Sequence, residues 1–297
     1  MKKPQLPTGT GVKPVGVSRT ATPSGGAKAG TSTPGVERIV AARRPAPPLM
    51  PQRVRQKDAT PTQSTGLGLT SERALQRMIE RLRAAGGTDE RVLAAMQSVP
   101  RHLFVDEAFA SRAYEDAALP IGHRQTISSP VTVARMLSLL LNRPAVNGSA
   151  GAGGSEMSAG RTGCVLEVGA GCGYQAAVLA RLYGQVYSIE RLEALFDKAK
   201  GNLTRADSKA VQLVYGDGFA GLPDKGPFDA IIVAAAGTEI PKALMEQMAV
   251  GGRMVLPLVE GRRQVLAVVD RTPTRWTTER MDIVNFVPLL QGTVARS

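Results

Sequence analysis

Cysteine and histidine are scarce in this chain. Its 297 residues include two cysteines, Cys164 and Cys172, and two histidines, and no Cys/His pair has the spacing of metal ligands. Two cysteines cannot build a disulfide framework, and the shortage of ligands argues against a zinc site. We therefore expect a protein of a reducing compartment that binds no metal.

Long apolar runs are also missing. No stretch approaches the roughly 20 apolar residues that span a bilayer, and the first residues, MKKPQLPTGTGVKP, lack the apolar core of a signal peptide. With 43% hydrophobic residues the chain can still bury a sizeable core. These features predict a cytoplasmic protein with no membrane segment.

Acidic and aromatic residues are rare in the first 70 residues. This segment has eleven Lys or Arg, ten prolines, no Phe, Tyr or Trp, and only two acids, Glu37 and Asp58, so it carries most of the net charge of +12. It cannot bury enough apolar surface to offset the entropy of ordering. Residues 1–70 are predicted to be a disordered basic tail that either only aids solubility or binds weakly to a polyanion.

Residues 71–297 are predicted to form one α/β domain. Four apolar residues between 75 and 82 have helical spacing after Thr70 or Ser71 as the N-cap, and two more helices are expected after Thr88 and over residues 131–141. Residues 143–163 read as a flexible Gly/Ala/Ser-rich insert.

Short strands and helices alternate beyond this insert. Strands are expected at residues 164–168, 185–190, 211–215, 229–233, 253–257, 264–269 and 281–287, with helices at 175–183, 192–203 and 241–248. Such alternation predicts a doubly wound, mainly parallel sheet, which the helices before residue 142 cover as an N-terminal cap.

A glycine-rich loop, Gly169 to Gly173, joins the first of these strands to the next helix. Glycines let the backbone turn tightly and approach a ligand closely. Tyr174 occupies the position where a nicotinamide dinucleotide fingerprint needs a small residue, and Glu167 precedes the loop. A cationic amino-acid ligand therefore fits better than a pyrophosphate, although a plain tight turn stays open.

Two more acids follow the next strands. Glu190 ends the second strand, roughly 20 residues beyond the glycines, where a carboxylate can accept both ribose hydroxyls. Asp217 follows the third strand and is placed to accept from an adenine amino group. Each acid alone is more often a strand end or a cap. Together with Glu167, they lie at the carboxyl ends of successive strands and predict S-adenosylmethionine as cofactor.

Longer segments carry a more specific signal. They are VLEVGAGCGYQAAVLARL, VYSIERLEALFDKAK, GDGFAGLP, PFDAIIVAAAGTEIPKALMEQMAVGGRMVLPL, SVPRHLFVDEAFASRAYEDAALPIG, QTISSP and VNFVPLLQG. Over about residues 71–292 this series resembles the protein-L-isoaspartate O-methyltransferase family. The resemblance implies a Rossmann-like fold that methylates the free α-carboxyl of isoaspartyl residues in aged proteins, with isoaspartyl peptides as partners.

The resemblance also implies which residues act. Ser128 is the active-site serine, with Thr126 as its neighbour, and the expected cofactor-binding residues are Glu167, Gly169, Ala170, Gly171, Gly173, Glu190, Asp217 and Gly218. A carboxylate is already nucleophilic at neutral pH, so Ser128 should orient it rather than attack with a histidine base. His123 is expected at the surface and His102 in a structural role.

The chain departs from the family pattern near Ser128. Arg124 stands where a glycine is common, and Val131 follows Pro130 where an aromatic residue or histidine often appears. These two changes leave the peptide preference open. Residues 234–240 are predicted to line the peptide groove, and a monomer is expected.

Two alternatives stay open. A nucleic-acid methyltransferase recruited by the tail would need an N-P-P-Y-like or cysteine motif after the fourth strand, where the chain has VAAAGTEIP. A non-catalytic module that binds polyanions would tolerate decay of the glycines and acids, which are intact.

Overall fold

The structure, a computed structural model, describes residues 67–143 and 163–296. The predicted tail therefore lies outside the described residues except for its last four, and the insert except for its two ends. Those last four residues of the expected tail are helical. Helix α1 (Leu67–Ala85) begins before the expected cap at Thr70 or Ser71, so this helix starts earlier than predicted. The division of the chain at residue 70 stays a prediction.

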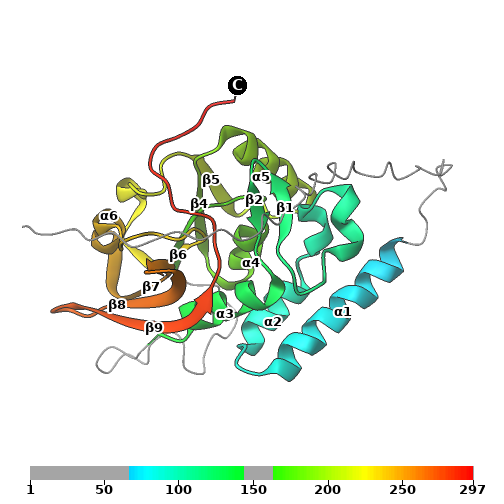
Figure 1. Cartoon of the computed structure of the whole chain (residues 1–297), viewed down its shortest axis with the longest axis horizontal. Coiled ribbons are helices and arrows are strands. Elements are labelled where there is room, and N and C mark those ends of the chain that lie inside the picture. The colour runs from blue at the N-terminus through cyan, green and yellow to red at the C-terminus, as the bar shows by residue number, and fades with distance from the viewer. Residues whose placement is uncertain (1–66, 144–162, 297) are drawn as a thin grey trace, which may run out of the picture. The chain divides into compact units, whose positions relative to one another are not determined.

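Helices and a short hairpin precede the sheet (Figure 1). After α1 come α2 (Glu90–Gln97), the 3-10 helices η1 (Arg101–Phe104) and η2 (Glu107–Arg112), the strands β1 (Leu119–Gly122) and β2 (Gln125–Ile127), and α3 (Pro130–Leu141). Gly86 and Gly87 end α1 with φ angles of 75° and 73°, which glycine adopts without strain. The Asp89 side chain accepts from the Arg91 backbone N–H and caps α2.

Seven strands form the central sheet. They are β3 (Cys164–Val168), β4 (Gln185–Glu190), β5 (Val211–Tyr215), β6 (Phe228–Val233), β7 (Met248–Glu260), β8 (Arg263–Arg271) and β9 (Trp276–Val284). Their order is β5-β4-β3-β6-β7-β8-β9. The pairs from β5 to β7 are parallel, and β8 and β9 add antiparallel strands at one edge. The predicted mainly parallel α/β sheet is confirmed.

The strands at the antiparallel edge differ most from the prediction. Strand β7 is 13 residues long, and β9 runs from Trp276 to Val284 instead of 281–287. Most β9 side chains are exposed, so this edge strand lacks the alternation of apolar and polar residues that would mark it. The sequence pattern therefore located its last residues only.

Alternate side chains of the sheet enter two cores. On one face, Val165 and Ile232 pack with α1 to α5, including α4 (Tyr174–Leu182) and α5 (Glu193–Arg205). On the other, Leu166 and Val233 pack with Leu244 of the short helix α6 (Lys242–Glu246).

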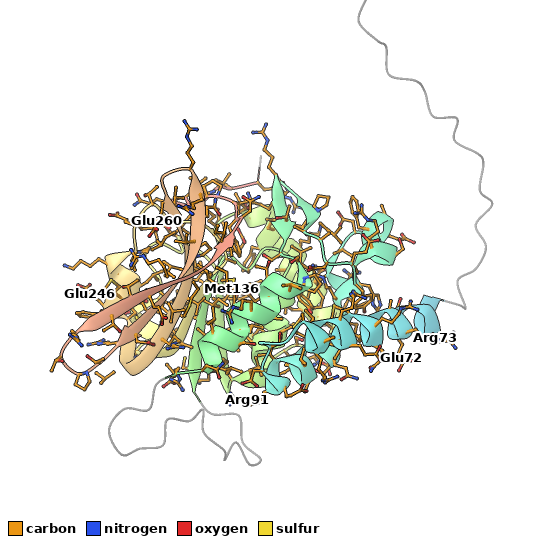
Figure 2. All side chains as sticks on the ribbon, turned by 60° about the horizontal axis from the view of Figure 1, so that its bottom comes forward. Glu72, Arg73, Arg91, Met136, Glu246 and Glu260 are labelled. Carbon is orange, nitrogen blue, oxygen red and sulfur yellow. The ribbon has the colours of Figure 1, made fainter. Side chains whose placement is uncertain are left out.

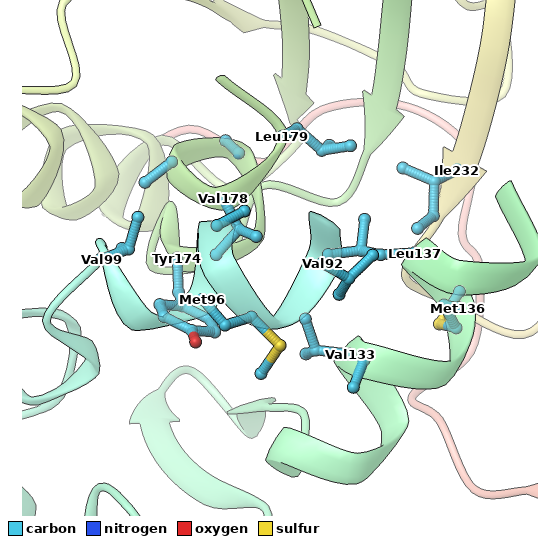
Figure 3. Close-up of a cluster of buried hydrophobic side chains, with 14 of the residues drawn as sticks. Val92, Met96, Val99, Val133, Met136, Leu137, Tyr174, Val178, Leu179 and Ile232 are labelled. Atoms are coloured by element: carbon cyan, nitrogen blue, oxygen red, sulfur yellow. The ribbon is translucent and has the colours of Figure 1, made fainter. Parts of the chain in front are cut away.

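Residues of both layers can be found in the figures. In Figure 3, Met96 of α2 lies beside Tyr174 and Val178 of α4 in the first core. Figure 2 labels Met136 on α3, in the helical layer, and Glu246 on α6, on the other side of the sheet. The predicted N-terminal helices therefore do cover one face of the sheet.

Strand β3 lies at the topological switch point of the sheet. The chain continues from β3 to β4 and β5 on one side, and then crosses to β6 on the other. The connections leave β3 in opposite directions, which opens a crevice at the carboxyl ends of β3 and β6. The glycine loop and Ala234 begin at this crevice.

Candidate active site

The glycine loop wraps around the end of the neighbouring strand. The backbone N–H groups of Gly169 and Ala170 both donate to the Ile189 carbonyl, at 2.9 and 3.0 Å. Gly169 and Gly171 have φ angles of 92° and 58°, in the left-handed region where a Cβ is strained. The loop is therefore held in a shape that requires glycine.

Glu190 ties this loop to the end of β4. One carboxylate oxygen accepts from the Gly171 N–H at 2.8 Å and the other from the Leu192 N–H at 2.9 Å. The side chain is only 5% exposed. Burial raises the pKa of Glu190, and the backbone N–H groups oppose that rise. A carboxylate held in this way has further lone pairs for a hydroxyl-bearing ligand.

A cleft opens above the glycine loop and Glu190. Its walls come from the β1–β2 hairpin, the ends of β3, β4 and β6, the first turn of α4, and the segment 287–290. The lining residues are Ile121, Gln125, Thr126, Ile127, Ser128, Val133, Val168, Gly169, Ala170, Gly171, Cys172, Tyr174, Gln175, Ile189, Glu190, Arg191, Leu192, Leu195, Gly218, Ala234, Ala235, Val287, Pro288, Leu289 and Leu290. Seven residues predicted for the site thus lie around one cleft: Thr126, Ser128, Gly169, Ala170, Gly171, Glu190 and Gly218.

A second cleft adjoins the first. It is lined by Ala118, Thr126, Ser128, Ser129, Thr132, Ala234 and residues 283–287. Four of these, Thr126, Ser128, Ala234 and Val287, also line the first cleft, so they form the wall between the two. Of the loop 234–240, Ala234 reaches this second cleft.

The hairpin that carries Thr126 has a strained turn. Its two turn residues, His123 and Arg124, have φ angles of 51° and 58°. A two-residue hairpin turn with both φ angles positive favours Asn and Gly, so Arg124 adopts the conformation that a glycine would relieve. His123 is exposed, as predicted, and its ring makes no hydrogen bond to Ser128 in the described part of the chain. A Ser–His nucleophile therefore has no geometric support.

Glu167 lies beneath the cleft, not in its wall. The side chain is 0% exposed and accepts from the Ser188 hydroxyl, because Glu167 and Ser188 are register partners on β3 and β4. Burial raises its pKa to about 8, against the opposing hydrogen bond from Ser188.

Between Glu167 and the cleft, two buried polar side-chain atoms lack a hydrogen-bond partner among the described residues. Gln175 also opposes the rise in the pKa of Glu167, yet the two side chains do not meet in hydrogen-bond geometry. Glu167 Oε1 and Gln175 Nε2 are both buried without a hydrogen-bond partner among the described residues. Because Gln175 lines the cleft, this acceptor and donor suit a zwitterionic amino-acid ligand.

Gly173 and Asp217 also lie outside the lining. A Cβ on Gly173 would come within 3.1 Å of Leu203 Cγ, so this glycine permits close packing of α4 on α5. The Asp217 carboxylate accepts from the N–H groups of Phe219 at 2.9 Å and Gly292 at 2.7 Å. As direct cofactor ligands, Glu167, Gly173 and Asp217 remain predictions.

The sequence pattern missed the segment 287–290. It reaches the cleft because Ala236 N–H donates to the Val287 carbonyl and Leu289 N–H to the Ala236 carbonyl, both at 2.8 Å. Arg191 then donates to the Gly292 carbonyl at 2.9 Å. The spacing of residues along the chain does not predict such contacts. The family resemblance did include this segment, as part of VNFVPLLQG.

Two basic residues that hold the β1–β2 hairpin and the segment after it were missed as well. Lys198 donates to the Ile121 carbonyl at 2.8 Å and so attaches the hairpin to α5. Arg101 is fully buried and donates to the Ser128 carbonyl at 2.6 Å. His102, from the same segment, lies 2.7 Å from the Tyr114 hydroxyl through Nδ1, and burial lowers its pKa. This partly buried position agrees with the predicted structural role.

Neither a metal site nor a membrane helix is found in the described ranges. Residues 67–143 and 163–296 contain no group of three or more His, Cys, Asp or Glu that could hold a metal ion. Their helices are also too short or too polar to cross a membrane.

The glycine loop, the strand-end carboxylate and the sheet topology define a class I S-adenosylmethionine-dependent methyltransferase. A model of the protein-L-isoaspartate(D-aspartate) O-methyltransferase family matches residues 73–294. The chain belongs to this family, whose reaction is methyl transfer to isoaspartyl residues in protein repair.

Close relatives carry the same name. The protein-L-isoaspartate O-methyltransferase of Dechloromonas aromatica is 54% identical over 228 residues, which cover 77% of this chain and 98% of the relative. That of Burkholderia thailandensis is 53% identical over 243 residues, covering 80% and 69% of the two chains.

Solved structures agree on the fold. One protein-L-isoaspartate O-methyltransferase aligns with a TM-score of 0.62 at 25% identity, over 72% of this chain and 65% of its own, slightly less than two thirds. A Plasmodium falciparum protein of this name, in complex with S-adenosyl-L-homocysteine, aligns with a TM-score of 0.60 at 24% identity, over 74% and 98%.

Proposed function

We propose that the first cleft binds S-adenosylmethionine and the second binds the isoaspartyl peptide, with transfer across the wall that they share. The observation that carries this proposal is that four residues line both clefts: Thr126, Ser128, Ala234 and Val287. A transfer between two bound reactants needs such a wall, where the attacking oxygen and the methyl carbon can meet in line.

The cofactor residues divide into two groups. Gly169, Gly171 and Gly218 let the ligand approach the backbone, and Glu190 accepts the ribose hydroxyls. Glu167 supports the amino-acid end from beneath, together with Gln175. The bound cofactor supplies an electrophilic methyl group on a sulfonium.

Ser128 and Thr126 bind and orient the acceptor carboxylate. The isoaspartyl carboxylate is ionised at neutral pH, so no base is needed to generate the nucleophile. The two hydroxyls donate to the carboxylate and replace part of its water shell, which fixes the angle of attack. One oxygen–carbon bond forms, one sulfur–carbon bond breaks, and the opposite charges of the reactants cancel.

The partners and the location are also part of the proposal. Isoaspartyl-containing peptides and proteins are the acceptors, in line with the family. The two free cysteines, Cys164 and Cys172, support a reducing, cytoplasmic setting. The monomeric state stays a prediction, and the predicted polyanion contact of the tail falls outside the described residues.

Paired peptides test the division of roles. Labelled S-adenosylmethionine is incubated with two peptides that differ only in isoaspartate against normal aspartate. Wild type is expected to form a base-labile methyl ester on the isoaspartyl peptide alone. Ser128→Ala should lower kcat about 10- to 100-fold, the loss expected when a hydrogen bond to a charged group is removed.

Ser98→Ala provides the matched control. Ser98 is an exposed hydroxyl at the end of α2 that donates to the Ala95 carbonyl, and it lines neither cleft. Its loss should leave kcat unchanged. Equal rates for Ser128→Ala and Ser98→Ala would contradict the role given to Ser128.

A further inference from the structure

Arg101 is a buried cation without a carboxylate partner. Its side chain is 0% exposed and is one of the largest fully buried side chains among the described residues. No Asp or Glu in the described part of the chain forms an ion pair with it. Burying an unpaired charge is costly, and burial lowers the pKa of this guanidinium. A residue kept at such a cost calls for a specific task.

The contacts of Arg101 reach both halves of the site. Nε donates to the Ala113 carbonyl at 2.7 Å and Nη2 to the Ser128 carbonyl at 2.6 Å. The guanidinium carbon lies 4.8 Å from the centre of the Tyr174 ring, a cation–π distance. Tyr174 follows the glycine loop as the first residue of α4 and lines the cofactor cleft. Arg101 therefore contacts both Ser128, in the wall between the two clefts, and α4, the helix that follows the glycine loop.

A hydrogen bond to the Ser128 carbonyl is well placed to fix the position of Ser128 in the wall between the two clefts. Ser128 lies between the end of β2 and the N-cap of α3, where regular hydrogen bonding is interrupted. A bond to its carbonyl restricts the peptide plane and thereby the direction of the Ser128 hydroxyl. The fork of an arginine can hold two carbonyls while its flat face stacks on a ring, and a lysine cannot do both.

We propose that Arg101 is a positioning residue for methyl transfer, which fixes the Ser128 hydroxyl relative to the cofactor loop through the Ser128 carbonyl and the Tyr174 ring. This inference rests on the proposed role of Ser128. Arg101 has no anionic partner of its own among the described residues, and the isoaspartyl carboxylate of a bound peptide would bring a negative charge close to it. The charge of Arg101 therefore favours binding of the ionised peptide.

Two substitutions separate the charge from the geometry. Arg101→Lys keeps the charge but loses the fork and the stacking, so kcat should fall about 10- to 100-fold while the KM for the peptide changes little. Arg101→Met removes the charge as well, so the KM should also rise. Cofactor affinity, measured by calorimetry, is expected to change less than threefold in Arg101→Lys.

A double-mutant cycle with Ser128→Ala tests whether Arg101 acts through the serine. Once the hydroxyl is absent, its orientation no longer matters, so Arg101→Lys should lower kcat less than threefold in the Ser128→Ala background. Equal losses in both backgrounds would overturn the proposal. Absence of methylation by wild type would instead defeat the proposed function itself.

Arg253→Lys is the matched control for a merely structural effect. Arg253 is also buried and donates to a backbone carbonyl, that of Leu139 at 2.9 Å, but it is paired with Asp270 at 2.7 Å. Its substitution should lower the melting temperature without lowering kcat. If Arg101→Met fails to fold, Arg101→Lys decides. If Arg101→Lys loses folding and cofactor binding together, Arg101 is a core residue and the proposal fails.

Discussion

Replacing Glu167 by glutamine is expected to change how stability depends on pH. Glu167 is fully buried under the first cleft, and its pKa rises from 4.5 to about 8 because burial penalises the charged form. Glutamine has nearly the same shape, carries no proton to lose and can still accept from Ser188. The substitution therefore removes one titration and little else.

The magnitude follows from proton linkage. Unfolded Glu167 releases its proton near pH 4.5 and folded Glu167 near pH 8. Between these values the folded state holds the extra proton, so the free energy of unfolding falls by about 1.4 kcal/mol per pH unit as pH rises. The stabilising contribution is complete below pH 4.5 and is lost as pH passes 8, for a total of about 5 kcal/mol as an upper limit. Glu167→Gln should escape this loss.

Urea unfolding of both proteins from pH 5 to pH 9 measures the effect. With a slope of about 2–3 kcal/mol per molar urea, the midpoint of wild type should drop by roughly 1–2 M relative to Glu167→Gln across this range. Glu90→Gln is the control: Glu90 is exposed and a hydrogen bond from Arg83 lowers its pKa, so its stabilising contribution is lost only as pH falls below 4.5. Its curve should run parallel to wild type. Parallel curves for Glu167→Gln would refute the reasoning.

Three further substitutions test the site. Glu190→Gln turns one acceptor oxygen into a donor that faces the N–H of Gly171 or Leu192, so the Kd for S-adenosylmethionine should rise about 10- to 100-fold by calorimetry; an unchanged Kd would remove Glu190 from the cofactor site. Gly218→Ala would place a Cβ 2.3 Å from Val168 Cγ1, and the forced shift should cost about 1–3 kcal/mol in urea unfolding and weaken cofactor binding; full affinity would mean that the cleft wall tolerates the shift. Arg124→Gly relieves a left-handed φ of 58°. The free energy of unfolding should therefore rise by up to about 1 kcal/mol, after the extra backbone entropy of glycine in the unfolded state is deducted. A lower urea midpoint would show instead that the Arg124 side chain stabilises the turn.

The sequence predicted the parallel strands and the edge at which the site lies. Short runs rich in apolar residues marked β3, β4 and β5, and all three matched their predicted bounds, although β5 at the edge of the sheet is only partly buried. Glu190 was expected at the cofactor because it ends its strand, and it does line the cleft. Glu167 lies one residue before the end of β3, so its side chain enters the face that α4 covers, together with that of Val165. The alternation of side chains along a strand already contained that distinction.

What the sequence could not predict are contacts between residues far apart along the chain. Arg101 meets Ser128 across 27 positions, and the Asp217 carboxylate meets the Gly292 N–H across 75. Both end on backbone groups, a carbonyl that every residue type carries and an N–H that every type except proline carries, so no side-chain pattern at the partner position identifies them. The residues that contact the reactants recur in local motifs because the chemistry limits their type. The groups that aim those residues are limited only by where the fold brings a backbone N–H or carbonyl, and only a three-dimensional structure supplies that.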